Sequence, residues 1–150
     1  DSDVAGYEIM ELNVLQTEFW SIVVPPEWWA EREEDSIIIG DRDEVGTIEI
    51  STLVRDAGVF EAAEVADIAA ENAEQDYQFK PATAGQFKGV SAQWRDDDNA
   101  VREWYLACGG LLLFVTYCCD LDNAGMDDAA VDEILDTLEF EQAPVPEGVS

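Results

Sequence analysis

The sequence predicts an α+β domain in which a central antiparallel β-sheet has helices packed on both faces. The uncharged run from Trp104 to Cys119 is typical of two buried strands around a glycine turn. Two segments with helical spacing of apolar residues lie at 60–75 and after Asp127. The other apolar runs are short and bounded by turn residues, which is typical of strands.

The run from Trp104 to Cys119 is too short to cross a membrane, because a spanning helix needs about 20 apolar residues. Gly109 and Gly110 would each cost a helix about 1 kcal/mol. A two-residue turn at these glycines instead pairs Leu106 with Leu113, and both faces of the hairpin are then apolar. We therefore predict a hairpin in the middle of a sheet covered on both sides, and no membrane insertion.

The same register determines how the three cysteines lie. Cys118 falls opposite Val101 and Cys119 opposite Ala100, too far from Cys108 for a disulfide. The chain has no histidine that could activate a thiol. We therefore expect three structural cysteines that act as small hydrophobic residues.

Further strands and two helices follow from shorter patterns. In the strand that begins at Gly46, Ile48 and Ile50 point to the core and Glu49 to solvent. Lys80-Pro81 is assigned to a loop. Expected strands are 19–24, 36–40, 46–53 and 85–94, with an edge strand within 7–14. The first helix has Val65, Ile68 and Ala69 at helical spacing, and the second, capped by Asp127 or Asp128, has Val131, Ile134, Leu135 and Leu138.

The chain of 150 residues is predicted to form one domain, residues 1–150, because no repeat or linker divides it. Its core is expected from about residue 15 to 140, followed by a loose tail at 142–150. The odd number of cysteines favours a reducing compartment such as the cytoplasm. The chain opens on Asp1 rather than Met, so prior removal of a signal peptide stays an open alternative.

The formal net charge is −28, from 35 acidic and seven basic residues. Nucleic-acid binding needs a basic surface, and anionic membranes would repel this chain, so neither partner is expected. Two explanations of the acidity remain: life in high salt, or a basic protein partner. The chain has only two lysines, Lys80 and Lys88, against 17 aspartates, and this composition favours life in high salt.

Four segments together resemble the PsbP-like (Mog/PsbP) superfamily. They are "FWSIVVPPEWW", "GTIEIS", "REWYLACGGLLLFVTYCC" and "VDEILDTLEF", within about residues 15–140. The resemblance implies an α/β/α sandwich that serves binding and scaffolding rather than catalysis. It supplies no motif that assigns a role to a particular residue.

Motifs for catalysis or metal binding are not convincing. "DLDNAGMDD" (120–128) begins like an EF-hand loop, but Ala124 and Val131 occupy positions where oxygen ligands are required. "DDDN" (96–99) is typical of a solvated turn. We expect no catalytic residue, no metal and no cofactor.

Trp28 and Trp29 are the candidate partner-binding residues. Adjacent indoles leave a chain in different directions, so one is expected in the core and the other partly exposed. An exposed indole would suit a protein partner, because Trp is enriched in binding hot spots.

The leading hypothesis is therefore a non-enzymatic protein-binding or scaffolding module with an acidic surface. One alternative is an acidic, immunity-type inhibitor of a basic toxin. The other is a hydrolase with two facing carboxyl groups about 5–10 Å apart in a deep cleft.

Overall fold

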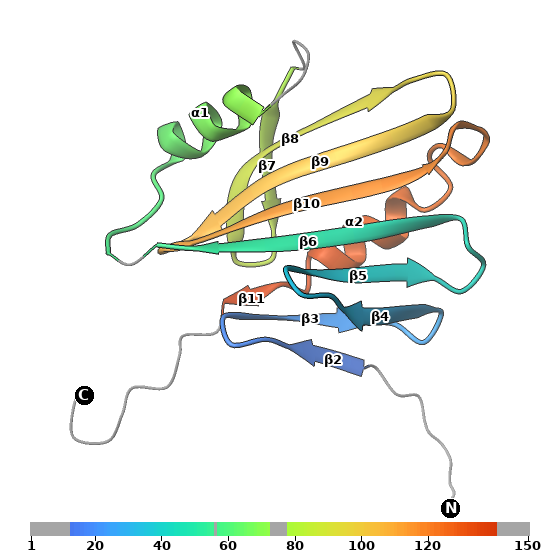
Figure 1. Cartoon of the computed structure of the whole chain (residues 1–150), viewed down its shortest axis with the longest axis horizontal. Coiled ribbons are helices and arrows are strands. Elements are labelled where there is room, and N and C mark those ends of the chain that lie inside the picture. Colours follow the sequence, from blue (N-terminus) through green and yellow to red (C-terminus); the bar gives the residue numbers. More distant parts are fainter. Residues whose placement is uncertain (1–12, 56, 73–77, 141–150) are drawn as a thin grey trace, which may run out of the picture.

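The computed structural model describes residues 13–55, 57–72 and 78–140, and the structural statements below concern these residues. They form a seven-stranded antiparallel sheet in the order β4-β5-β6-β10-β9-β8-β7 and a three-stranded sheet in the order β11-β3-β2 (Figure 1). The α+β class is thereby confirmed. The strands are β2 (Asn13–Gln16), β3 (Trp20–Val24), β4 (Trp28–Arg32), β5 (Ser36–Asp41), β6 (Gly46–Val54), β7 (Lys80–Ala84), β8 (Phe87–Arg95), β9 (Asn99–Cys108), β10 (Leu111–Asp120) and β11 (Glu139–Phe140). The helices are α1 (Ala62–Asn72), α2 (Asp128–Leu135) and the short 3-10 turn η1 (Leu121–Asn123).

The predicted hairpin is confirmed as β9 and β10, which lie at the centre of the large sheet. Leu106 pairs with Leu113, and Cys118 pairs with Val101, as the glycine turn requires. Strand β10 also pairs with β6, and β9 with β8, so both strands have two neighbours. This position explains why most of the run needs no charge: over most of its length both faces lie against other elements, and only at Cys118 is a side chain exposed.

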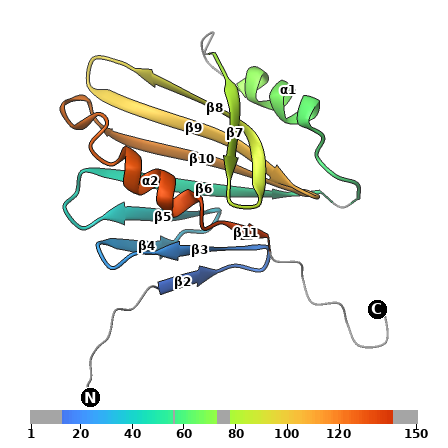
Figure 2. The same ribbon diagram turned by 180° about the vertical axis from the view of Figure 1, so that it is seen from behind.

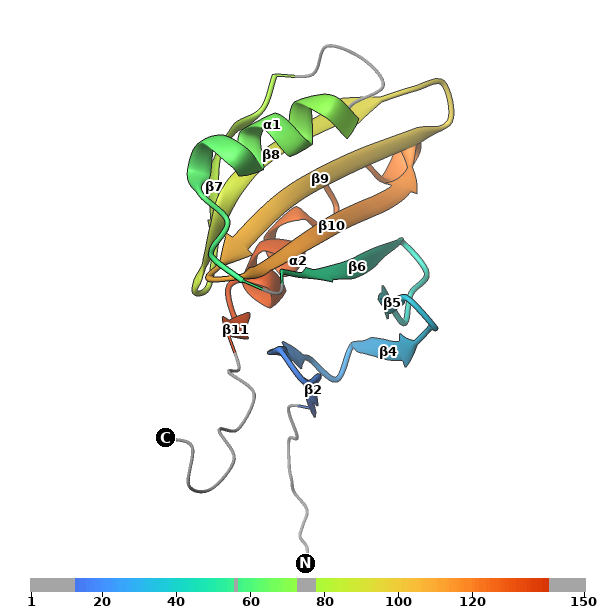
Figure 3. The same ribbon diagram turned by 60° about the vertical axis from the view of Figure 1, so that its left-hand side comes forward.

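Helix α1 covers one face of the large sheet at β8 and β9 (Figure 3). Its Val65 and Ala69 pack with Tyr105 and Leu112 in a small cluster of buried residues. Neighbouring residues of a strand point to opposite faces, so Leu113 belongs to the other side.

The opposite face carries the larger core. Leu113 packs there with Ile22 of the small sheet and with Val131 and Ile134 of α2. Figure 2 shows α2 in front of β6 and β10, with the small sheet beside it. This face is therefore covered by a helix together with a second β-sheet, an arrangement that the sequence analysis did not predict.

Three strands were missed: β4, β7 and β11. Lys80-Pro81, assigned above to a loop, begins β7, and this prediction was wrong. Proline has no backbone N–H to donate. It is tolerated there because β7 is the edge strand of its sheet and has no neighbouring strand on one side. The predicted edge strand within 7–14 is described only from Asn13, and the tail at 142–150 lies outside the described residues.

Within the described ranges, neither helix has the length and apolar character that crossing a bilayer requires.

Candidate functional site

One end of the large sheet brings together two acids and a tyrosine from three separate segments of the chain. Strand β5 ends there at Asp41, and β6 begins at Gly46 after a tight turn. Tyr117 lies near the end of β10, and Asp127 directly precedes α2. These chain segments meet at the right-hand end of Figure 1, opposite the Gly109-Gly110 turn.

Asp41 is a buried acid, with 6% of its surface exposed. Its Oδ1 atom accepts a hydrogen bond from the backbone N–H of Val45 at 2.8 Å, which closes the turn between β5 and β6. Its Oδ2 atom is buried and has no hydrogen-bond partner among the described residues. A buried carboxylate oxygen without a hydrogen-bond partner is energetically costly.

The Tyr117 side chain makes a hydrogen bond with Asp127. The Tyr117 hydroxyl donates to Asp127 Oδ2 at 2.8 Å. Gly46 leaves room for this hydroxyl, because a Cβ atom at Gly46 would overlap the Tyr117 ring and its oxygen. Asp127 occupies the N-cap position of α2, as expected, but its side chain makes no capping hydrogen bond. Its side chain instead accepts the hydrogen bond from Tyr117 of β10.

The carboxyl groups of Asp41 and Asp127 lie close enough to affect each other's charge. Burial, followed by the hydrogen bond to Asp41, raises the pKa of Asp127 to about 6, against the opposing effect of the Tyr117 hydrogen bond. The negative charge of Asp43 acts in the same direction as burial. Burial also raises the pKa of Tyr117, which therefore remains a hydrogen-bond donor at neutral pH.

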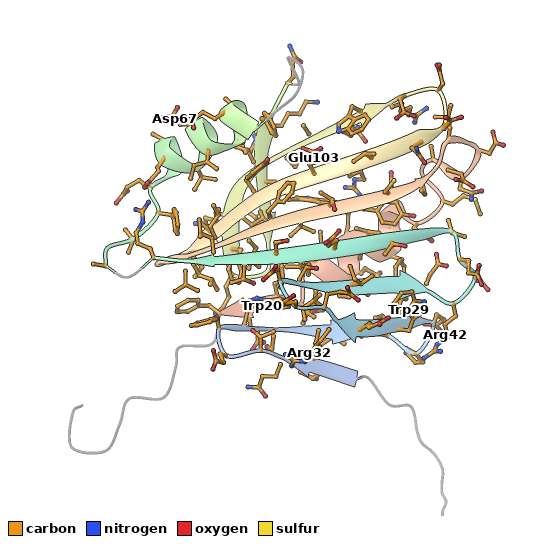
Figure 4. All side chains as sticks on the ribbon, in the orientation of Figure 1. Trp20, Trp29, Arg32, Arg42, Asp67 and Glu103 are labelled. Carbon is orange, nitrogen blue, oxygen red and sulfur yellow. The ribbon has the colours of Figure 1, made fainter. Side chains whose placement is uncertain are left out.

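A surface groove of about 470 Å³ lies beside this pair. Trp29 forms one side of it, and Figure 4 shows this side chain at the same end of the molecule as Arg42. The indole lies against Gly40 of the neighbouring strand, where a Cβ atom would overlap the ring. The acidic residues that line the groove are Asp41, Glu44 and Asp120.

The structure separates the two predicted site residues. Trp28 is 4% exposed and packs in the large core, whereas Trp29 is half-buried at the groove. The alternation of side chains along β4 accounts for this difference. Trp28 is thus part of the core and does not offer a contact surface, so the partner-binding hypothesis now concerns Trp29.

The three cysteines are free thiols, and only Cys119 of them is buried. Cys118 is exposed, so the expectation that it serves as a core residue was wrong: position 118 lies on the face of β10 that no helix covers at this end. Burial raises the pKa of all three thiols, with added repulsion from Asp96 and Asp120 at Cys118. They are therefore protonated and poorly nucleophilic at neutral pH. Among the described residues, no group of three acidic or sulfur side chains could hold a metal ion.

The Asp41–Asp127 pair was not predicted. The sequence analysis ended a strand at residue 40, one residue before Asp41, and placed Asp127 or Asp128 at a helix cap; Asp41 is the last residue of β5, and Asp127 is the N-cap of α2. Their meeting depends on the antiparallel pairing of β5, β6 and β10, which brings the end of β5 next to the end of β10. The one local signal was Tyr117, a polar aromatic on the inward face of the hairpin.

The sequence matches no protein-family model and no curated protein. Among solved structures, a crystal structure of a Bacteroides thetaiotaomicron protein is similar, with a TM-score of 0.62 and 17% identity over 82% of this chain. The chain spans 45% of the length of that protein. The solution structure of cyanobacterial PsbP (CyanoP) from Synechocystis sp. PCC 6803 has a TM-score of 0.43 and 10% identity, covering 93% of this chain and 98% of that one. The first likeness concerns the fold alone.

Proposed function

We propose that this chain is a non-enzymatic protein-binding module that recognises a basic partner at the groove beside Trp29. The observation that carries the proposal is the half-buried Trp29 indole in a groove whose charged lining is acidic. An indole offers a large, rigid contact area, and Trp is enriched among residues that dominate binding energy. The surrounding carboxylates supply the electrostatic complement to a basic surface.

The charge of the whole chain supports the same partner class. A net charge of −28 attracts a basic protein over a long range and accelerates its association at low salt. The immunity-type inhibitor of a basic toxin is one form of this proposal, because it needs the same acidic contact surface.

The carboxylate-based hydrolase is less well supported. Retaining and inverting glycosidases hold their two carboxyl groups about 5 to 9.5 Å apart around the scissile bond. Asp41 is buried, and it lies close enough to Asp127 to raise the pKa of that carboxyl group. A substrate bond does not fit between groups that already contact each other.

We also propose, on the order of its elements, that the chain is an α/β/α sandwich of the PsbP-like kind, in which binding roles predominate. The three unpaired cysteines support a reducing compartment such as the cytoplasm.

Replacing Trp29 by Ala tests the function. We expect Trp29→Ala to weaken binding of a Lys/Arg-rich peptide by about 2 kcal/mol or more, about 30-fold. The unfolding midpoint should change little, because Trp29 is only half-buried. Binding is measured by calorimetry and stability by thermal melting.

Trp94→Ala is the matched control. Trp94 is also a half-buried tryptophan, but its indole N–H donates to Glu103 Oε2 at 2.9 Å, and it does not line the groove. Equal loss of binding in the two variants would contradict the proposed site, and so would a peptide that binds neither variant nor the parent chain.

A further inference from the structure

We propose that a pocket beside the first turn of α1 binds a small amphipathic carboxylate, with the apolar part of the ligand inside the pocket and its carboxylate at Lys88. This pocket, which we call the α1 pocket, has a volume of about 510 Å³, as is usual for small-molecule sites. Phe60 lines it and donates its backbone N–H to the Gly109 carbonyl at 2.9 Å. The α1 pocket therefore lies at the other end of the hairpin from the groove beside Trp29.

Apolar side chains from several elements form the walls of the α1 pocket. The segment that enters α1 and the first turn of this helix supply three of them, and strands β7, β8 and β9 supply one each (Figure 3). In chain order they are Phe60, Ala62, Val65, Pro81, Val90 and Ala107. Val65 is buried against the sheet, whereas Ala62 is exposed, so the pocket has a covered base and opens toward solvent at the start of α1. The apolar part of a ligand would lose its contact with water here.

Lys88 lies on the side of β8 that faces this pocket. Strand residues two positions apart point to the same face, so Lys88 shares a face with Val90, which packs against the buried cluster that contains Val65. Across the ladder, Lys88 pairs with Ala107, another residue of the pocket. The lysine is exposed, so its stem lies along apolar walls while its ammonium group reaches the rim.

The charge at the α1 pocket is opposite in sign to that of the chain as a whole. The chain has 35 acids and two lysines, yet among the described residues that line this pocket none is acidic and one is a lysine. Lys88 makes no ion pair with any residue that the structure describes. Glu64, the acid in the first turn of α1, is already paired with Arg55. The charge of Lys88 is thus available to a ligand.

Two further groups favour a negative charge at the rim. Helix α1 has 11 residues, its first turn lines the pocket, and the N-terminal end of a helix carries a partial positive charge. Gln86, in the β7–β8 turn, also lines the pocket. Its Oε1 accepts the Phe140 N–H at 2.7 Å, which leaves its NH2 group to donate to a ligand. One lysine with these weaker donors matches a single carboxylate attached to an apolar group.

Calorimetry and thermal melting with decanoate test the site. Acetate and decanol are the matched control ligands, since they carry the carboxylate alone and the apolar chain alone. We expect decanoate to bind the full chain and to raise its melting temperature, because a ligand that binds only the native state stabilises it. Decanol should bind about 10-fold more weakly, the usual effect of losing a hydrogen bond to a charged group, and acetate should not bind measurably.

Lys88→Gln and Lys80→Gln are matched variants, because each removes one of the two lysine charges of the chain. Lys80 is also exposed, but it does not line the α1 pocket. Lys88→Gln should weaken decanoate binding about 10-fold, and Lys80→Gln should change it by about twofold or less. Ala62→Trp keeps both lysines and fills the pocket from an exposed position, so it should abolish binding without lowering the melting temperature of the free protein.

Two free cysteines give an independent reading of where the ligand lies. Cys108 lines the α1 pocket, whereas Cys118 is exposed at the other end of the hairpin. Decanoate should slow the alkylation of Cys108 by N-ethylmaleimide and leave that of Cys118 unchanged, as measured by mass spectrometry of the labelled peptides.

The contrary outcomes are equally specific. Equal binding of decanoate and decanol would show a purely apolar site and overturn the assignment to a carboxylate. Equal weakening by Lys88→Gln and Lys80→Gln would show that only the net charge matters. Unchanged alkylation of Cys108 would place the ligand elsewhere, as on the exposed Leu53, Val54 and Val59. Any of these results, or no binding of decanoate, would overturn the inference and leave the proposed function standing, since that function depends on a basic peptide at Trp29.

Discussion

At the two ends of the β9–β10 hairpin, the pKa of an acidic side chain is shifted in opposite directions. At the Gly109-Gly110 end, Arg55 forms an ion pair with Glu64, and its guanidinium lies 4.0 Å from the centre of the Phe60 ring. The hydrogen bond from Arg55 lowers the pKa of Glu64. At the other end, burial and the contact with Asp41 raise the pKa of Asp127.

This difference shows what a shortage of cations does to an acidic protein. Seven basic residues cannot neutralise 35 acids, so most acids have no basic partner. An ion pair between a basic residue and an acid therefore stabilises only its own local contact. Arg102 does so for α2, donating to Asp132 Oδ1 at 2.9 Å. Where Asp41 and Asp127 meet without a cation, burial and the neighbouring acid raise the pKa of Asp127 to about 6. We therefore expect the acidic end to respond to pH in the opposite sense to the Gly109-Gly110 end.

The largest expected effect is that of salt on the whole chain. Raising NaCl or KCl from about 0.1 to 1 M shortens the Debye length from about 10 to 3 Å and screens repulsion among the unpaired acids. We expect the melting temperature to rise, although the same screening weakens the Arg55–Glu64 pair. The series is run with EDTA to remove any effect of calcium. A melting temperature that is flat or falls would mean that ion pairs, rather than unpaired acids, dominate the electrostatics.

The next effect comes from glycine substitutions at the two ends. Gly46→Ala forces Tyr117 away from Asp127 and should cost about 1–3 kcal/mol of unfolding free energy, the usual cost of overpacking. Gly109→Ala is the control: its φ of 59° is strained for alanine, at about 1–2 kcal/mol, but it contacts no part of the acid pair. Only Gly46→Ala should change the NMR titration of Asp127. If Gly109→Ala moves that titration equally, the ends are coupled and the comparison fails.

The smallest effect is the opposite pH response of two single acids. Asp127 has a raised pKa, so the native state binds its proton more tightly than the unfolded state, where the ordinary value is 3.8. Its stabilising contribution is complete below pH 3.8 and is lost as the pH rises to about 6. Glu64 has a lowered pKa, so its contribution is present above its ordinary value of 4.5 and is lost in acid.

Thermal melting from pH 3 to 8 measures both responses. Compared with the parent chain, Asp127→Asn should show a smaller loss of stability between pH 4 and 6. Glu64→Gln should show a smaller loss on acidification below pH 4.5. Parallel melting curves for the three proteins would refute the opposite titration of the two ends.

The sequence by itself determined the parts of this protein that depend on local patterns. The uncharged run around Gly109-Gly110 determines the hairpin and its register, since a two-residue turn allows one pairing and both faces are apolar. The spacing of Val131, Ile134 and Leu135 likewise determines the buried side of α2. The contrast between Trp28 and Trp29 follows from the alternation of adjacent side chains.

The tertiary structure alone decided which distant residues meet. Strand β7 exists because β8 offers it an edge, although Pro81 argues against a strand locally. Strand β3 forms a second sheet with β2 and β11, whose short runs carry almost no pattern of their own. Asp41 and Asp127 have ordinary local roles at a strand end and at a helix start. The raised pKa of Asp127 arises only because β5, β6 and β10 pair side by side and bring the buried Asp41 next to it.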